Sequence, residues 1–476
     1  MKEKRPPRGG LRTLGVFSIA MINLAIIYSI RGLPLLAEEG TAAGFYLLVS
    51  AIFFLIPVAF ISAELATGWP PKGPGGIYIW VRQALGERWG FVAIWMQWSE
   101  NVIWLPTVLS FIGATIAFIF MPSLAENKIY MLVTILLIYW AGTFANFRGM
   151  KTSAWISTLG VIGTMVSTAL IIGMGIAWLV SGNPLQVELS WDAMLPDLSN
   201  LNNLVFLAGV MVITSGIEVS AVHEGEVKNP GRVFPRAIFL SAAISFCALL
   251  LGAMGIAFVV PATDISLVAG VMEAFEKFFE AYHVKWLVPA VAVLIVIGSI
   301  GEVAAWILGP SKGLLTTARD GLLPPFFQRC NKQHVPVSIL WVQASIVTGL
   351  VMIFLLMPTI NSAYWILTAL TAQIYLVMYI LLFVAGIVLR YKEPDTPRAF
   401  RVPFGNAGMW FFGILGIFGA IFTLFIGFLP PSQIKTGSLY FYETFLIGGM
   451  VVMVLLPIII FALRKPHWKN EIPFSP

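Results

Sequence analysis

Long apolar segments recur along almost the whole chain, and short polar loops separate them. A helix needs roughly 20 mostly apolar residues to cross the hydrocarbon core of a bilayer. Segments of that length are found near residues 14–37, 44–67, 89–120, 129–146, 153–181, 202–223, 235–260, 286–316, 337–357, 361–389, 408–428 and 441–463. The pattern predicts an all-α polytopic membrane protein with about 12 transmembrane helices.

The composition agrees with a membrane protein and argues against several other classes. Hydrophobic residues make up 58% of the chain and charged residues only 11%, whereas a soluble domain carries about 25% charged residues. The two cysteines, Cys247 and Cys330, are too few for a disulfide framework or a cysteine metal site. No metalloprotease or phosphate-loop motif occurs either. We therefore expect no enzymatic activity, no metal, no cofactor and no nucleic-acid partner.

The basic residues are distributed unevenly between the two sets of loops. With an even number of spans, both termini lie on one side, and 24 of the 29 lysines and arginines fall on that side. Cytoplasmic loops of membrane proteins carry an excess of Lys and Arg. The distribution predicts that both termini are cytoplasmic, in the inner membrane of a bacterium.

Two of the predicted spans contain helix-breaking sequences. Ile30, Arg31 and Gly32 precede a proline in the first span, and Thr214, Ser215 and Gly216 interrupt the sixth. Irregular backbone is tolerated at membrane depth only where it is buried in protein or lines a cavity. Breaks in corresponding positions of helices 1–5 and 6–10 are typical of an inverted-repeat transporter with its site at the midplane. The alternative is a pair of ordinary kinked helices.

Four ionisable residues within the spans are candidates for function, because such groups are costly in a membrane. Arg31 can hold a substrate carboxylate through two parallel hydrogen bonds, or it can pair with Glu218 or Glu302. Glu218 can accept a proton or bind the amine of a substrate, and Glu302 is a second proton-coupling candidate. For both, the alternative is a structural hydrogen bond. Glu100 is a weaker candidate for proton coupling.

The broken helices favour a zwitterionic substrate. Free amides at a half-helix N-terminus bind a carboxylate, while the opposing carbonyl ends suit an ammonium group. Tyr375 and Tyr379 are four residues apart and share one helix face. Together with Trp306, they are candidates to line or gate the pathway, and the alternative role for all three is packing.

Four stretches of the sequence resemble a known family: 57–81, 216–237, 302–324 and 374–379. They are similar to the amino acid–polyamine–organocation (APC) transporters, and most closely to the bacterial glutamate/GABA antiporters. By position, Glu218, Glu302, Trp306, Tyr375 and Tyr379 match residues that line the pathway of that family. The chain departs from the family at Arg31 and Gly32, where its members have aromatic and acidic residues.

The resemblance implies a LeuT-like fold of five plus five helices, with helices 1 and 6 broken and helices 11 and 12 peripheral. The expected divisions are a cytoplasmic N-terminus (1–13), a first repeat (14–181), a second repeat (202–389), a peripheral pair (408–463) and a short cytoplasmic C-terminus (464–476). The implied activity is exchange of an acidic or neutral amino acid for a related amino acid or amine.

Alternatives to exchange are a proton-coupled amino acid symporter and a membrane sensor that has lost transport. The expected partners are an amino acid substrate, its counter-substrate and membrane lipids, and the protein is expected to be a monomer or a homodimer.

Overall fold

The computed structural model describes residues 15–70, 75–148, 150–219 and 230–469. The predicted N-terminal segment 1–13 and part of the predicted C-terminal segment 464–476 lie outside the described residues. Within the described ranges, the secondary structure is helical and contains no strand. The predicted all-α class is therefore confirmed.

Eleven helical segments of the described chain are long and apolar enough to cross a membrane. They are Gly40–Gly68, Glu87–Phe120, Lys128–Asn146, Ile162–Val180, Leu201–Val219, Gly231–Val259, Lys285–Arg319, Val337–Leu356, Ile360–Lys392, Gly405–Ile426 and Leu439–Ala462. Each corresponds to a predicted span. The first predicted span is absent from this set because it is broken into two short helices, α1 (Val16–Ile27) and α2 (Leu33–Ala37).

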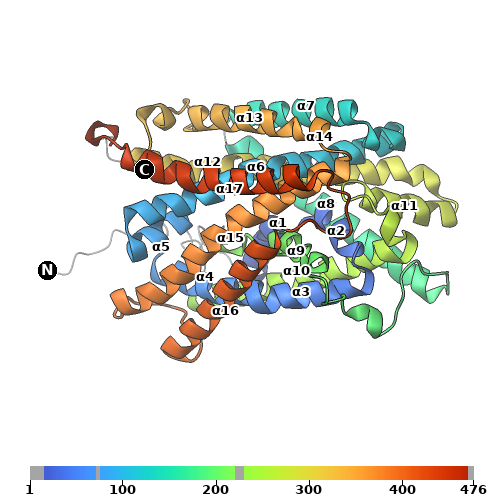
Figure 1. The fold of residues 1–476 in the computed structure, drawn as a ribbon, viewed down its shortest axis with the longest axis horizontal. Coiled ribbons are helices and arrows are strands. Elements are labelled where there is room, and N and C mark those ends of the chain that lie inside the picture. Colours follow the sequence, from blue (N-terminus) through green and yellow to red (C-terminus); the bar gives the residue numbers. More distant parts are fainter. Residues whose placement is uncertain (1–14, 71–74, 149, 220–229, 470–476) are drawn as a thin grey trace.

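The long helices lie side by side in one bundle (Figure 1). The remaining helices in chain order are α3 (Ala43–Ser50), α4 (Ile56–Gly68), α5 (Gly76–Leu85), α6 (Glu87–Phe120), α7 (Lys128–Asn146), α8 (Met150–Val180), α9 (Leu207–Ile213), α10 (Pro230–Val259), α11 (Gly270–Ala281), α12 (Val288–Arg319), α13 (Val337–Val351), α14 (Ile353–Leu356), α15 (Ile360–Lys392), α16 (Gly405–Ile426) and α17 (Leu439–Ala462).

Helices α6, α12 and α15 form the centre of the bundle, where α6 packs against both of the others. In the most apolar stretch of α6, 89% of the residues are buried, whereas only 11% are buried in the corresponding stretch of α17. Helix α8 packs closely on α12 through glycines. A Cβ added to Gly160 would lie 2.7 Å from the carbonyl oxygen of Gly298, so only glycine allows the two backbones to approach this closely.

The first break differs slightly from its predicted position. Helix α1 ends at Ile27, and Tyr28 and Ser29 are extended, with ψ angles of 124° and 127°. A short 3-10 turn, Ile30–Gly32, then leads into α2. Pro34 lies in the first turn of α2, where its missing N–H has no intrahelical partner to lose. The proline therefore starts the second half-helix, and the extended residues precede the predicted Ile30–Pro34 segment.

The second break lies where it was predicted. Helix α9 ends at Ile213, and Gly216 has a φ of +98°. This left-handed backbone conformation is common only for glycine. The broken form of both predicted helices is thereby confirmed up to residue 219, where the described part of this segment ends.

Short helices also lie at the two ends of the bundle. Helix α5 follows Gly75, which has a φ of +99°, and its apolar face is buried on α6 and α15. Helix α11 lies between the predicted spans 235–260 and 286–316. The two helices lie at opposite ends of the bundle (Figure 1), as the alternation of loops requires.

Candidate functional site

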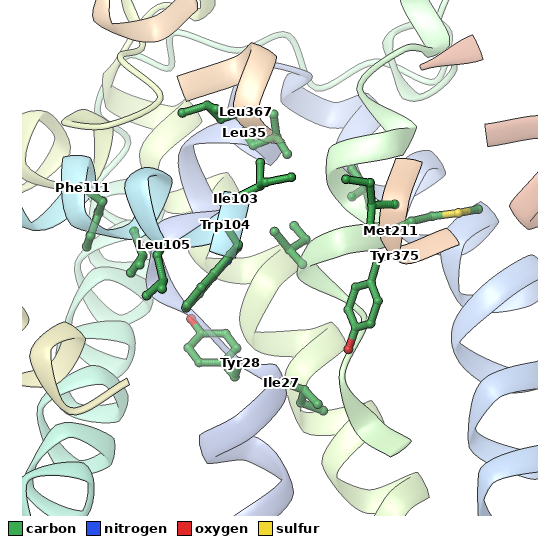
Figure 2. Packing of buried hydrophobic residues seen from close by; sticks show 14 of the residues in the cluster. Ile27, Tyr28, Leu35, Ile103, Trp104, Leu105, Phe111, Met211, Leu367 and Tyr375 are labelled. Carbon is green, nitrogen blue, oxygen red and sulfur yellow. The ribbon is translucent and has the colours of Figure 1, made fainter. Parts of the chain in front are cut away.

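The two breaks lie against the central helices α6, α12 and α15, and polar side chains gather there. Figure 2 shows the ring of Tyr28 below Trp104 of α6, with Tyr375 of α15 on the opposite side of the view, where its hydroxyl bonds to Glu218 near the second break. Tyr28 donates or accepts a hydrogen bond at 2.8 Å with Thr168 of α8. The extended backbone between α1 and α2 is thus enclosed by protein on several sides.

Arg31 is the cation of this region, and its side chain is only 3% exposed. One guanidinium nitrogen, Nη1, donates to the Tyr364 hydroxyl at 2.8 Å and to Thr107 Oγ1 at 3.3 Å. The guanidinium carbon lies 5.3 Å from the ring centroid of Trp104 and 5.9 Å from that of Tyr364. Its Nε has no hydrogen-bond partner in the described chain. Aromatic rings attract such a cation but carry no neutralising charge.

The predicted alternative, an ion pair from Arg31 to Glu218 or Glu302, is not formed. No carboxylate of the described residues lies within ion-pairing distance of the guanidinium. Glu302 and Glu100 are nonetheless within electrostatic range of it.

Glu218 is held by the two predicted tyrosines. Tyr375 donates to Glu218 Oε1 at 2.8 Å, and Tyr379 donates to Oε2 at 2.7 Å. The Tyr379 hydroxyl also accepts a hydrogen bond from the backbone N–H of Gly216 at 2.8 Å. The tyrosine pair therefore joins α15 to the second break through both oxygens of one carboxylate.

Glu302 of α12 connects to the first break. Ser29 Oγ donates to Glu302 Oε2 at 3.0 Å, so one of the extended residues binds the mid-helix carboxylate. One helical turn further along, the backbone carbonyl of Trp306 accepts from Asn101 Nδ2 at 2.9 Å. The Trp306 ring lies 5.8 Å from the Trp104 ring. Glu302 thus bonds to a residue of the first break, and Glu218 bonds to the two tyrosines, one of which also contacts the second break.

Glu100 is different from the other two carboxyl groups. It lies on α6 and is 4% exposed, and its Oε2 atom is buried without a hydrogen-bond partner among the described residues. It lies within electrostatic range of both Glu218 and Arg31.

The remaining predicted residues form the backbone of the breaks. Ile30 is buried, and a Cβ on Gly32 would lie 3.0 Å from Ile213, so the first break packs directly against the end of α9. Thr214 Oγ1 bonds with Ser50 Oγ at 2.8 Å. Ser215 Oγ donates to the carbonyl of Val212 at 2.6 Å. These hydroxyls bond to backbone carbonyls and to a neighbouring hydroxyl.

Four residues of the site were missed by the sequence reasoning: Ser29, Trp104, Thr107 and Tyr364. Trp104 and Thr107 follow Glu100 by four and seven residues and so share its helix face. That periodicity was a usable signal. No feature of the sequence indicated Tyr364, because its contact with Arg31 depends on how α15 packs beside the first break.

The chain is similar to known proteins over nearly its whole length. The family model described as amino acid permease matches residues 14–457. An uncharacterized transporter of Legionella pneumophila is 44% identical over 447 residues, covering 94% of this chain and 96% of the relative. A glutamate/gamma-aminobutyrate antiporter of Lactococcus lactis is 32% identical over 469 residues, covering 97% and 92%. A probable agmatine/putrescine antiporter of the same species is 24% identical over 457 residues, covering 95% of each chain.

These relatives are transporters and antiporters, which confirms the expectation that the chain is not an enzyme. The matched region includes both breaks, the three carboxyl groups and Arg31. The chain belongs to the amino acid permease family of multi-pass membrane proteins.

Proposed function

We propose that the protein is an antiporter that exchanges an acidic or neutral amino acid for a related amino acid or amine by alternating access around the two breaks. The observation that carries the proposal is the environment of Arg31. A guanidinium cannot be neutralised by losing its proton, and a buried charge requires compensation. Its described contacts are neutral hydroxyls and rings. A substrate carboxylate provides the missing negative charge.

The relatives support the choice of substrate and of mechanism. Among the proteins that match over nearly the full length, two are named as glutamate/gamma-aminobutyrate antiporters and one as a probable agmatine/putrescine antiporter. An anion-binding arginine favours glutamate-like substrates over agmatine or putrescine, which have no carboxylate. In this proposal, Ile30, Gly32, Thr214, Ser215 and Gly216 supply backbone groups at the two breaks.

The remaining candidates form the walls of the proposed pathway. Glu218 and Glu302 couple the two breaks to α15 and α12, and they remain candidates for carrying a proton. Trp306, Tyr375 and Tyr379 line the substrate path. We further propose that both termini lie in the cytoplasm of a bacterial cell, because 24 of the 29 lysines and arginines fall on their side of the predicted spans.

Counterflow in proteoliposomes tests the proposal. Vesicles containing the purified protein are loaded with unlabelled glutamate, with GABA or with buffer alone, and the uptake of external labelled glutamate is measured. We expect rapid uptake only into vesicles loaded with an exchangeable amino acid, and no uptake in vesicles containing Arg31→Ala.

Other results would contradict exchange. Equally fast uptake into empty, unenergised vesicles would rule out obligatory exchange. Uptake into empty vesicles that requires an imposed pH gradient would instead establish proton symport. If a panel of all common amino acids neither binds nor exchanges, the transporter proposal fails and a sensor becomes the better interpretation.

A further inference from the structure

We propose that Glu100 binds the ammonium group of the substrate and that, with Arg31, it selects molecules that carry both a carboxylate and an amine. This inference rests on the proposed function and specifies its substrate class. It differs from the expectation drawn from the sequence, in which Glu218 was the candidate for binding the amine and Glu100 a weak candidate for proton coupling.

The first step is the lack of a partner for Glu100. The side chain is 4% exposed, and Oε2 is buried with no hydrogen-bond donor among the described residues. Leaving a buried polar atom unpaired is costly, and more so for a charged one. A ligand that donates an N–H to this atom would complete its hydrogen bonds.

The second step is that the neighbouring carboxyl groups are already occupied. Both oxygens of Glu218 accept hydrogen bonds from tyrosines, and Oε2 of Glu302 accepts one from Ser29. An amine that approached Glu218 would have to displace Tyr375 or Tyr379, which join it to the second break. Of the three carboxyl groups, only Glu100 has a buried oxygen atom without a hydrogen-bond partner among the described residues.

The third step distinguishes an ammonium group from a proton. A proton placed on Oε2 would remove the charge of the group, but it would not bring this acceptor atom the external hydrogen-bond donor that it lacks. An ammonium group supplies both a positive charge and up to three N–H donors, so it satisfies both requirements.

The fourth step is the position of Glu100 relative to Arg31. Glu100, Trp104 and Thr107 share one face of α6, and Thr107 accepts a hydrogen bond from the guanidinium. With a rise of 1.5 Å per residue, Glu100 and Thr107 are about 10 Å apart along the helix axis. The ring of Trp104, which lies 5.3 Å from the guanidinium carbon, occupies the turn between them. Opposite charges at the two ends of this face suit a ligand whose own charges are several bonds apart.

The fifth step is the charge balance of the region. Among the described residues around the breaks, Glu100 and Glu302 lie within electrostatic range of Arg31, although neither forms an ion pair with it. A substrate carboxylate bound to Arg31 compensates the guanidinium but leaves Glu100 without a partner, so a substrate that also carries a cation is favoured in a low-dielectric site. A zwitterion adds no net charge, and its ammonium group compensates the carboxylate of Glu100.

Binding measurements with matched ligands test this assignment. The pair consists of the amino acid found to exchange in the counterflow assay and its analogue without the amine, which for glutamate is glutarate. Dissociation constants are measured by isothermal titration calorimetry for the full-length wild type, Glu100→Gln and Glu100→Asp. We expect the wild type to prefer the amino acid at least tenfold.

In Glu100→Gln, we expect the affinity for the amino acid to fall at least tenfold while that for the analogue falls less than twofold. Glu100→Asp keeps the charge and should recover part of the preference. Because the glutamine variant removes an unpaired buried charge, its melting temperature without ligand should be equal to or higher than that of the wild type, which separates a binding defect from misfolding.

The possible failures have different meanings. If the wild type exchanges amino acids but Glu100→Gln keeps the full preference over the analogue, the assignment of Glu100 is wrong and the proposed function stands. If Glu100→Gln keeps its affinities but loses the pH dependence of exchange, Glu100 carries a proton and the assignment is also overturned. If the wild type binds no amino acid, the proposed function itself is wrong.

Discussion

At the scale of single residues, the character of the site depends on which charged groups have partners. Arg31 is surrounded by two hydroxyls and two aromatic rings, and Glu218 is held by two tyrosines. These contacts fix the orientation of the side chains. They leave the positive charge of Arg31 without a direct negative partner in the described chain. Variants of Arg31 therefore test whether a substrate carboxylate binds there.

Replacing Arg31 by lysine separates charge from geometry. Lysine keeps the positive charge but loses the planar fork that makes two parallel hydrogen bonds to a carboxylate. We expect Arg31→Lys to weaken substrate binding by about 1–3 kcal/mol, the scale of a charge-assisted hydrogen bond, and Arg31→Ala to weaken it further. Scintillation proximity binding measures both, with the exposed Arg88→Lys as a control. Unchanged affinity in both Arg31 variants would show that the arginine has only a structural role.

At the scale of helices, a buried ion pair fastens the ends of α4 and α15. Arg390 donates through Nε and Nη2 to the two carboxylate oxygens of Glu64, each at 2.6 Å. The backbone N–H of Val402 donates to Glu64 Oε2 at 2.7 Å. Arg398 Nη1 lies 3.7 Å from Glu64 Oε1. Glu64 therefore has a structural role at one end of the bundle, away from the breaks.

Removing one partner of this pair should be costly. We expect Arg390→Met to lower the free energy of unfolding by about 3 kcal/mol, because the Glu64 carboxylate then stays buried with less compensation. The double variant Glu64→Gln/Arg390→Met should recover part of this loss, because no unpaired charge remains. Unfolding in mixed micelles of dodecyl maltoside and SDS measures the difference. If the double variant is less stable than Arg390→Met, the pair is not the source of the stability.

At the scale of the whole molecule, the two ends of the bundle carry different kinds of groups. The end with α5 is rich in exposed ion pairs, such as Arg82 with Glu87 and Asp320. At the opposite end, α11 packs one apolar face on the bundle, and its Glu273 accepts a hydrogen bond from the backbone N–H of Ser266 at 3.1 Å. Burial, together with the nearby negative charges of Glu126, Asp264 and Glu276, raises the pKa of Glu273 from 4.5 to about 7.

This raised pKa predicts how stability changes with pH. The folded state holds the proton of Glu273 more tightly than the unfolded chain, so the contribution to stability is complete below pH 4.5 and is lost as the pH rises through 7. We expect the wild type to lose up to about 3 kcal/mol between pH 4.5 and 8 from this group. Glu273→Gln should flatten that part of the profile of melting temperature against pH. The exposed Glu280→Gln on the same helix should keep the wild-type profile, and an identical profile in all three proteins would exclude Glu273 as the source.

The sequence alone determined the helical class, nearly all span positions and the presence of two broken helices. These properties are local: apolar length, glycine, proline and the distribution of basic residues all act within one segment or its adjacent loops. The first break was placed only approximately, because a proline ends one helix or begins the next according to its surroundings. In the structure, Pro34 lies at the beginning of a helix, α2.

Only the tertiary structure decided which charges are paired. Arg31 meets Thr107 and Tyr364, which are 76 and 333 positions away in the chain. Glu218 meets tyrosines 157 and 161 positions away. The sequence therefore identified the costly groups in the membrane but left open whether Arg31 pairs with a carboxylate of its own chain. That choice depends on the packing of α2, α6 and α15, because a hydrogen bond forms only where packing brings donor and acceptor within about 3 Å.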